Sequence, residues 1–165
     1  MFGEAPMMGL AKTEPCLLIL NDHEITNREQ ALAAILDCVV AQKLVDPSLV
    51  PELLDSIERR EELGPTAIGE GVAIPHTWHP GLDRIAVALG ISRQGLEYPS
   101  LDGEPVHIVL MILTPVSAEA EAVKQRIFDV WVHRLRNPAF RASLLLATRI
   151  EDLREGIRAE DRSWE

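Results

Sequence analysis

The sequence is poor in aromatic residues and in cysteine, and both shortages restrict how it can fold. Only 4% of its 165 residues are aromatic although 47% are hydrophobic, so aliphatic side chains must fill the core. Its two cysteines, Cys16 and Cys38, stand in apolar stretches, where a buried free thiol is commoner than a disulfide. A chain of this length buries one substantial core, which favours a single domain.

The sequence also lacks an excess of basic charge and any long apolar run. Lys and Arg number 16 against 26 Asp and Glu, a formal net charge of -10, which would repel a nucleic-acid backbone. No window approaches the roughly 18 apolar residues of a membrane helix, and the first residues lack the pattern of a secretion signal. We therefore expect a cytoplasmic protein with no nucleic-acid partner and no direct membrane insertion. Residues 1–14, rich in glycine and proline, are expected to form a flexible arm before a single domain over 15–160.

Hydrophobic periodicity predicts alternating helices and strands. Apolar residues three and four positions apart predict helices within residues 26–62 and over 118–136, with shorter helices after them. Nearly continuous apolar runs predict buried strands near 16–22, 84–92 and 105–113, and residues 66–75 form an extended segment interrupted by two glycines. Strands covered on both faces, with helices before and after them, predict an α/β fold: a three-layer-like sandwich with a central mixed β-sheet flanked by helices.

The candidate for chemistry is His76 in the stretch GEGVAIPHTWHP, residues 69–80. Pro75 stiffens the backbone before it, and the nearby glycines allow a partner to approach closely. Rigid placement beside an open approach suits a group attacked in line by a bulky donor. The residues alone leave a second reading open, in which His76 merely ends a strand.

Four chemistries compete for this histidine. A zinc site would need three or four ligands, and His76 with His79 offers two, because His23, His107 and His133 are distant in the sequence. The chain has no G-x-S-x-G motif for a nucleophilic serine, and neither cysteine has electropositive surroundings. It also has no phosphate-binding G-x-x-x-x-G-K-[ST] loop. Phosphoryl transfer through the imidazole needs only positive groups around the phosphoryl oxygens, so we expect no cofactor and no metal.

The block RREELGPTAIGEGVAIPH, residues 59–76, resembles the signature of the enzyme IIA domains of the fructose, mannitol and nitrogen-regulatory class in the phosphoenolpyruvate-dependent phosphotransferase system. The resemblance extends over about residues 15–160. It implies the enzyme IIA mannitol/nitrogen-type fold, and it implies that His76 accepts a phosphoryl group from the histidine phosphocarrier protein.

The resemblance also suggests which cations bind the phosphate. The family's Arg-Glu pair falls on Arg60 and Glu61, so Arg60 is the candidate for the phosphoryl oxygens, with a planar fork that suits phosphate. The second active-site histidine of the family falls on Lys124, which offers a flexible point charge instead. After the active histidine the family usually has Gly and then Lys or Arg, whereas Thr77, Trp78 and His79 follow His76 here and place a large ring beside the site. Lys124 and Trp78 are the two departures from the family pattern.

Two functions follow from the resemblance. The first is a phosphohistidine carrier in sugar transport or nitrogen-type regulation, which passes its phosphoryl group to an enzyme IIB or to a regulatory target protein. The second is a regulatory module on the same fold that binds partners without transferring phosphate. A zinc-dependent hydrolase stays open as a third reading.

Overall fold

The computed structural model describes residues 15–20 and 24–163, so the expected arm and His23 lie outside the described residues. The strands are β1 (Cys16–Ile19), β2 (Ala67–Gly69), β3 (Val72–Ala73), β4 (His76–Trp78), β5 (Ala86–Leu96) and β6 (Val106–Thr114). The helices are α2 (Arg28–Ala41), the short 3-10 helix η1 (Pro47–Leu49), α3 (Val50–Glu62), α4 (Ala118–Arg136), α5 (Pro138–Leu146) and α6 (Ile150–Arg162). None of these described helices is long and apolar enough to cross a membrane.

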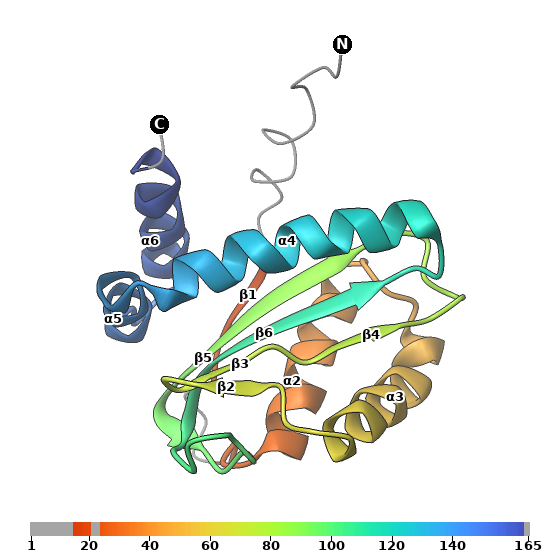
Figure 1. Ribbon diagram of the computed structural model, residues 1–165, viewed down its shortest axis with the longest axis horizontal. Helices are drawn as coiled ribbons and strands as arrows, with labels where there is room; N and C mark the ends of the chain where they lie inside the picture. The colour runs from red at the N-terminus through yellow and green to blue at the C-terminus, as the bar shows by residue number, and fades with distance from the viewer. Residues whose placement is uncertain (1–14, 21–23, 164–165) are drawn as a thin grey trace.

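The strands form one mixed sheet in the order β1-β5-β6-β3-β2, with β4 also paired to β6. The long hairpin of β5 and β6 is antiparallel, whereas β1 runs parallel to β5, and β3 and β4 run parallel to β6. Figure 1 shows this central hairpin with β3 and β4 along one of its sides. A mixed sheet is what the sequence predicts, and the fold class is confirmed.

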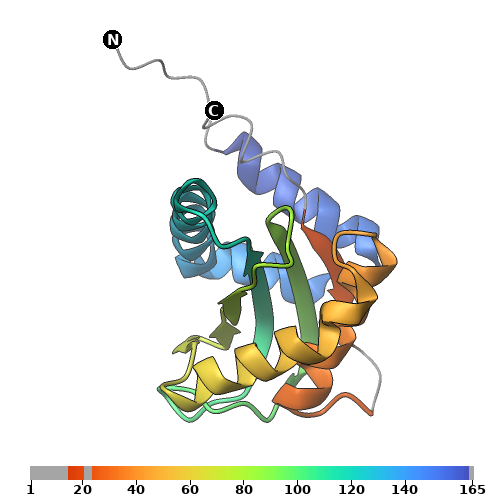
Figure 2. The same cartoon turned by 90° about the vertical axis from the view of Figure 1, so that its right-hand side faces the viewer.

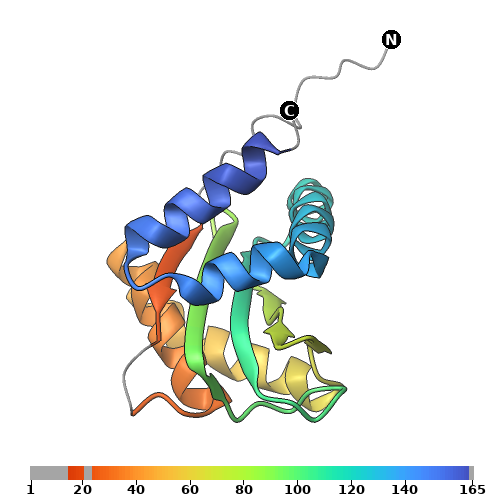
Figure 3. The same ribbon diagram turned by 90° about the vertical axis from the view of Figure 1, so that its left-hand side faces the viewer.

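Helices cover both faces of the sheet. On one face α2 and α3 pack against a cluster of buried side chains that includes Leu32, Leu53 and Met111. On the other face α4, α5 and α6 cover a second cluster that includes Leu89, Leu110 and Trp131. Figure 2 shows the sheet between these two groups of helices, and Figure 3 shows α5 and α6 lying across β1 and β5.

The extended segment expected at residues 66–75 is a hairpin. β2 turns back into antiparallel β3 through Gly69, Glu70 and Gly71, all three with positive φ. Glycine adopts this conformation without steric cost, which is why the turn forms between the two glycines. The sequence located the glycine interruptions but did not reveal that they reverse the chain.

Pro75 divides what would otherwise be one strand into β3 and β4. The Pro75 carbonyl accepts from the Ile112 amide on β6, at 3.0 Å. Proline has no N–H to donate back, so the ladder is interrupted at this residue. The pairing resumes at once, with His76 opposite Ile112. His76 therefore begins a short strand instead of ending one.

Candidate active site around His76

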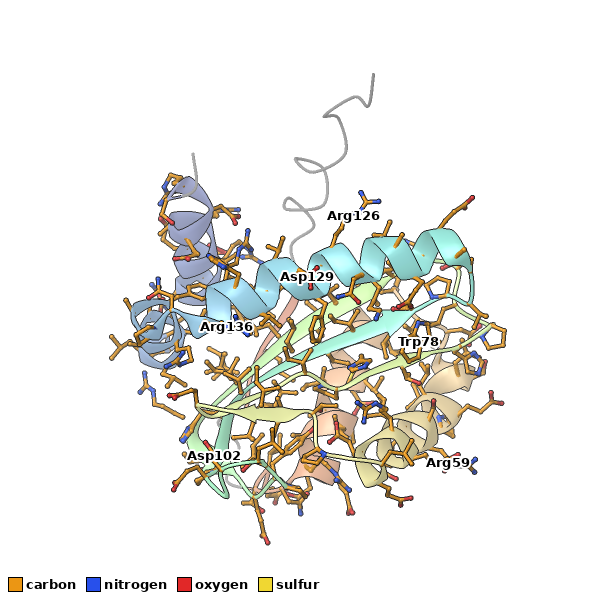
Figure 4. All side chains as sticks on the ribbon, in the orientation of Figure 1. Arg59, Trp78, Asp102, Arg126, Asp129 and Arg136 are labelled. Atoms are coloured by element: carbon orange, nitrogen blue, oxygen red, sulfur yellow. The ribbon has the colours of Figure 1, made fainter. Side chains whose placement is uncertain are left out.

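Strand alternation places His76 on the α4 face of the sheet. Its neighbour Thr77 faces the other way, where its hydroxyl contacts the hydroxyl of Ser56 on α3. The His76 ring meets the rings of Trp78 and Phe128 edge-on, with centroids 5.6 and 6.1 Å away. Side chains two positions apart on a strand share a face, so Trp78 lies beside His76, and Figure 4 shows it at β4 between α3 and α4. The histidine is half-buried between β4 and α4.

A hydrogen bond to the Ile74 carbonyl determines which ring nitrogen of His76 carries the proton, and further hydrogen bonds connect Ile74 to Glu61. Nδ1 lies 2.8 Å from the carbonyl oxygen of Ile74, which can only accept, so neutral His76 carries its proton on Nδ1. The Ile74 amide donates to the Thr66 carbonyl at 3.1 Å, and the Thr66 amide donates to Glu61 at 3.1 Å. The Thr66 hydroxyl also contacts Glu61. The lone pair of neutral His76 is thus left on Nε2, for which no hydrogen bond is found among the described residues.

The surroundings keep this imidazole neutral. Burial is the largest effect and lowers the pKa of His76 below its ordinary value, while the hydrogen bond to Ile74 raises it. The charges of Arg60 and Lys124 lower this pKa further, and the charge of Glu61 raises it. A neutral imidazole keeps the lone pair that a nucleophile needs. The same effects show that both cations expected from the sequence lie within electrostatic range of His76.

Arg60 occupies the end of α3, and its guanidinium is half-buried. Its Nη1 donates to the Gly64 carbonyl at 3.1 Å, beyond the last turn of the helix. Arg59 beside it points outward and forms an exposed ion pair with Asp55 at 3.1 Å (Figure 4). Of the two adjacent arginines, Arg60 is the one whose charge acts on His76, since it lowers the pKa of that imidazole.

Lys124 is buried although it carries a charge. The residue is 7% exposed, and its Nζ lies 2.9 Å from the Glu121 carboxylate and 5.0 Å from the centroid of the Trp78 ring. The Trp78 indole N–H donates to the same carboxylate at 2.5 Å. The Trp78 ring thus contacts both Lys124 and His76, and Trp78 itself is 40% exposed. The sequence alone would equally allow Lys124 to be a surface charge on the exposed side of its helix, and this burial contradicts that alternative.

The other described histidines serve elsewhere. His79 lies 2.6 Å from Glu52 on α3. His107 on β6 lies 2.9 Å from the Ser92 carbonyl of β5, within the sheet as its strand position indicates. His133 is exposed on α4. Within the described part of the chain, no three His, Cys, Asp or Glu side chains form a group that could hold a metal ion.

Sequence reasoning missed two residues of this site. Glu121 and Phe128 belong to α4 and contact β4 only because the helix crosses back over the sheet. Their helical spacing with Lys124 is visible in the sequence, since positions three and four apart share a helix face. Nothing in the sequence, however, pairs that face with Trp78.

Residues 15–159 match the family model described as "Phosphoenolpyruvate-dependent sugar phosphotransferase system, EIIA 2". The chain belongs to this family. A relative in Escherichia coli strain K12, the PTS system 2-O-alpha-mannosyl-D-glycerate-specific EIIABC component, is 31% identical over 129 residues, which are 78% of this chain and 19% of that protein. The chain spans less than half the length of the first curated relatives it matches.

Solved structures of other IIA proteins have the same fold. The nitrogen regulatory protein IIA-Ntr of Neisseria meningitidis superimposes with a TM-score of 0.70 at 22% identity, over 86% of this chain and 91% of that one. Enzyme IIA for mannitol from Escherichia coli, solved in complex with phosphorylated enzyme IIB, superimposes with a TM-score of 0.66 at 16% identity, over 87% of this chain and 94% of that one. The expected enzyme IIA mannitol/nitrogen-type fold is confirmed.

Proposed function

We propose that this EIIA protein carries a phosphoryl group on Nε2 of His76 within a phosphotransferase system. The observation that carries the proposal is the hydrogen bond between Nδ1 and the Ile74 carbonyl, because it leaves the nucleophilic lone pair on the other nitrogen. Family membership supports a phosphotransfer role in general. We infer the phosphohistidine, its donor and the roles of His76, Arg60 and Lys124.

The proposed phosphoryl transfer between two histidines requires neither a metal ion nor a nucleotide. The Nε2 lone pair attacks phosphorus, the new N–P bond forms, and the N–P bond of the donor phosphohistidine breaks with its electron pair returning to the donor ring. Nδ1 keeps its proton and its hydrogen bond to Ile74. Arg60 and Lys124 stabilise the charge on the phosphoryl oxygens, which is the main task of the protein in this kind of reaction.

The partners follow from the same chemistry. We propose the histidine phosphocarrier protein as donor and an enzyme IIB or a regulatory target protein as acceptor; the second role is supported by the complex of a structural neighbour with phosphorylated enzyme IIB. We also propose that residues 15–160 act as one domain, since the family model covers 15–159. A cytoplasmic location stays a prediction.

A regulatory docking module is the second candidate, and Trp78 favours it. This ring is 40% exposed beside His76, and exposed aromatic side chains often anchor protein interfaces. The two candidates differ in whether the phosphoryl group is accepted at all.

Incubation with phosphoenolpyruvate, the general phosphotransferase enzyme and the histidine phosphocarrier tests the proposal. We expect intact mass to show one acid-labile phosphoryl group on the native chain, none on His76→Gln, and one on the matched control His133→Gln. If the native chain stays unmodified while the same donor phosphorylates a known enzyme IIA, the carrier function is wrong and the docking module replaces it.

A further inference from the structure

The Glu121 carboxylate holds two donors from the His76 site at once. Lys124 lies one helical turn away on α4 and pairs with it at 2.9 Å, and the Trp78 indole N–H reaches it from β4. The Lys124 side chain is only 9% exposed, whereas that of Glu121 is 46% exposed. The two contacts with Glu121, from Lys124 and from Trp78, together lower the pKa of its carboxyl. Lys124, which is expected to bind the phosphoryl oxygens, is therefore already paired with a carboxylate.

Stability alone gives no reason for this arrangement. An ion pair with one half-exposed partner contributes little to folding, and burying the ammonium costs hydration. Lysine has a flexible stem and can exchange one anion for another nearby, and the Trp78 face beneath the ammonium stabilises it along such a path.

We propose, on the basis of the phosphocarrier function above, that Glu121 is a counter-ion that competes with the phosphoryl group of His76 for Lys124, and that Trp78 is a positioning residue that holds Glu121 for this competition. Lys124 pairs with Glu121 in the unmodified protein and turns to the phosphoryl oxygens when Nε2 is phosphorylated. The site then holds its phosphoryl group less tightly than two unopposed cations would, which favours passing it on.

The equilibrium of phosphoryl exchange tests this proposal better than a rate. When phosphorylated histidine carrier is mixed with this protein, the final distribution depends on the free energies of the two phosphorylated and two unmodified proteins, and not on how well they dock. Intact mass reads the four species directly.

Glu121→Gln is expected to shift the exchange equilibrium toward phosphorylated His76 by about tenfold, the effect of releasing one charged contact. Lys124→Met is expected to shift it the other way by about tenfold, and in the Lys124→Met background Glu121→Gln should change it by less than about twofold, because the two act through one another. Trp78→Phe should shift it in the same direction as Glu121→Gln, by less.

The matched controls are on the same helix. Glu119→Gln removes an exposed carboxylate in the first turn of α4, and Arg126→Met removes a cation that points away from the sheet (Figure 4). Neither should move the equilibrium. The imidazole pKa of His76, followed by NMR in the unmodified protein, should fall in Glu121→Gln and rise in Lys124→Met, because each variant removes a charge that interacts with this ring.

The outcomes separate the two proposals. If native protein accepts phosphate and Glu121→Gln behaves like Glu119→Gln, the counter-ion is wrong and the carrier function stands. If Glu121→Gln shifts the equilibrium equally with and without Lys124, the carboxylate repels the phosphoryl group directly and the competition is wrong. If native protein accepts no phosphate from a donor that modifies a control enzyme IIA, the proposed function fails and the counter-ion fails with it.

Discussion

Replacing Glu61 by glutamine tests the contribution of a buried carboxylate whose charge acts on His76. Glu61 is 5% exposed, accepts the Thr66 amide at 3.1 Å and contacts the Thr66 hydroxyl, and its Oε1 lies 3.5 Å from the Tyr98 hydroxyl. A glutamine has one oxygen in place of two, so at least one charge-assisted hydrogen bond is lost. Bonds of this kind contribute about 1.5 to 3 kcal/mol each.

We therefore expect Glu61→Gln to reduce the free energy of unfolding by about 2 kcal/mol, equivalent to about 4 to 8 °C in Tm for a domain of this size. Because the charge of Glu61 raises the pKa of His76, its removal should also lower that pKa. Urea unfolding at pH 7 measures the first effect, and an NMR titration of the His76 ring measures the second.

The control is Glu62→Gln, which removes the adjacent exposed carboxylate at the end of α3. If Glu61→Gln and Glu62→Gln agree within about 0.5 kcal/mol, the usual range for surface changes, the buried chain from Glu61 to His76 does not stabilise the fold as described. If the pKa of His76 is unchanged in Glu61→Gln, the charge of Glu61 does not act on the His76 ring.

Three further predictions follow from the core and from His76. A Cβ on Gly90 would lie 3.0 Å from Cδ1 of Ile35, so Gly90→Ala should destabilise by about 1 to 3 kcal/mol, whereas Gly156→Ala in α6, where the nearest atom is 3.5 Å away, should stabilise by about 0.5 to 1 kcal/mol; equal urea midpoints would contradict this. Burial raises the pKa of the Cys16 thiol to about 11, so a disulfide reagent at pH 8 should modify it far more slowly in native than in urea-unfolded protein, and fast native labelling would disprove this. The pKa of His76 is lowered by folding, so the unfolded chain binds the proton more readily and stability should fall as pH drops below about 6.5; His76→Gln should lack this component, and identical pH profiles would rule it out.

Sequence periodicity predicted the elements whose packing repeats regularly. The helix expected over 118–136 is α4 with those bounds, and the strands expected near 84–92 and 105–113 are β5 and β6. Helix α4 buries one stripe of side chains, and β5 and β6 bury both faces over most of their length, so the hydrophobic pattern is regular in each of them.

The site was only partly visible in the sequence because its contacts are between distant segments. His76, Arg60 and Lys124 were named from the resemblance, and Trp78 was noted beside them, but Glu121, which contacts Lys124 and Trp78, was not. Trp78 and Glu121 are separated by 43 positions, and their contact exists only because α4 crosses the edge of the sheet. Hydrophobic pattern records which face is buried and carries no information on which polar atoms meet there.

The most direct test of the account is the ¹⁵N and ³¹P NMR spectrum of the His76 ring before and after phosphorylation. We predict a neutral ring protonated at Nδ1 in the unmodified protein and a phosphoryl group on Nε2 in the modified one. A phosphoryl group on Nδ1, or a ring protonated at Nε2 before the reaction, would contradict the hydrogen bond to Ile74 as the feature that makes His76 the nucleophile.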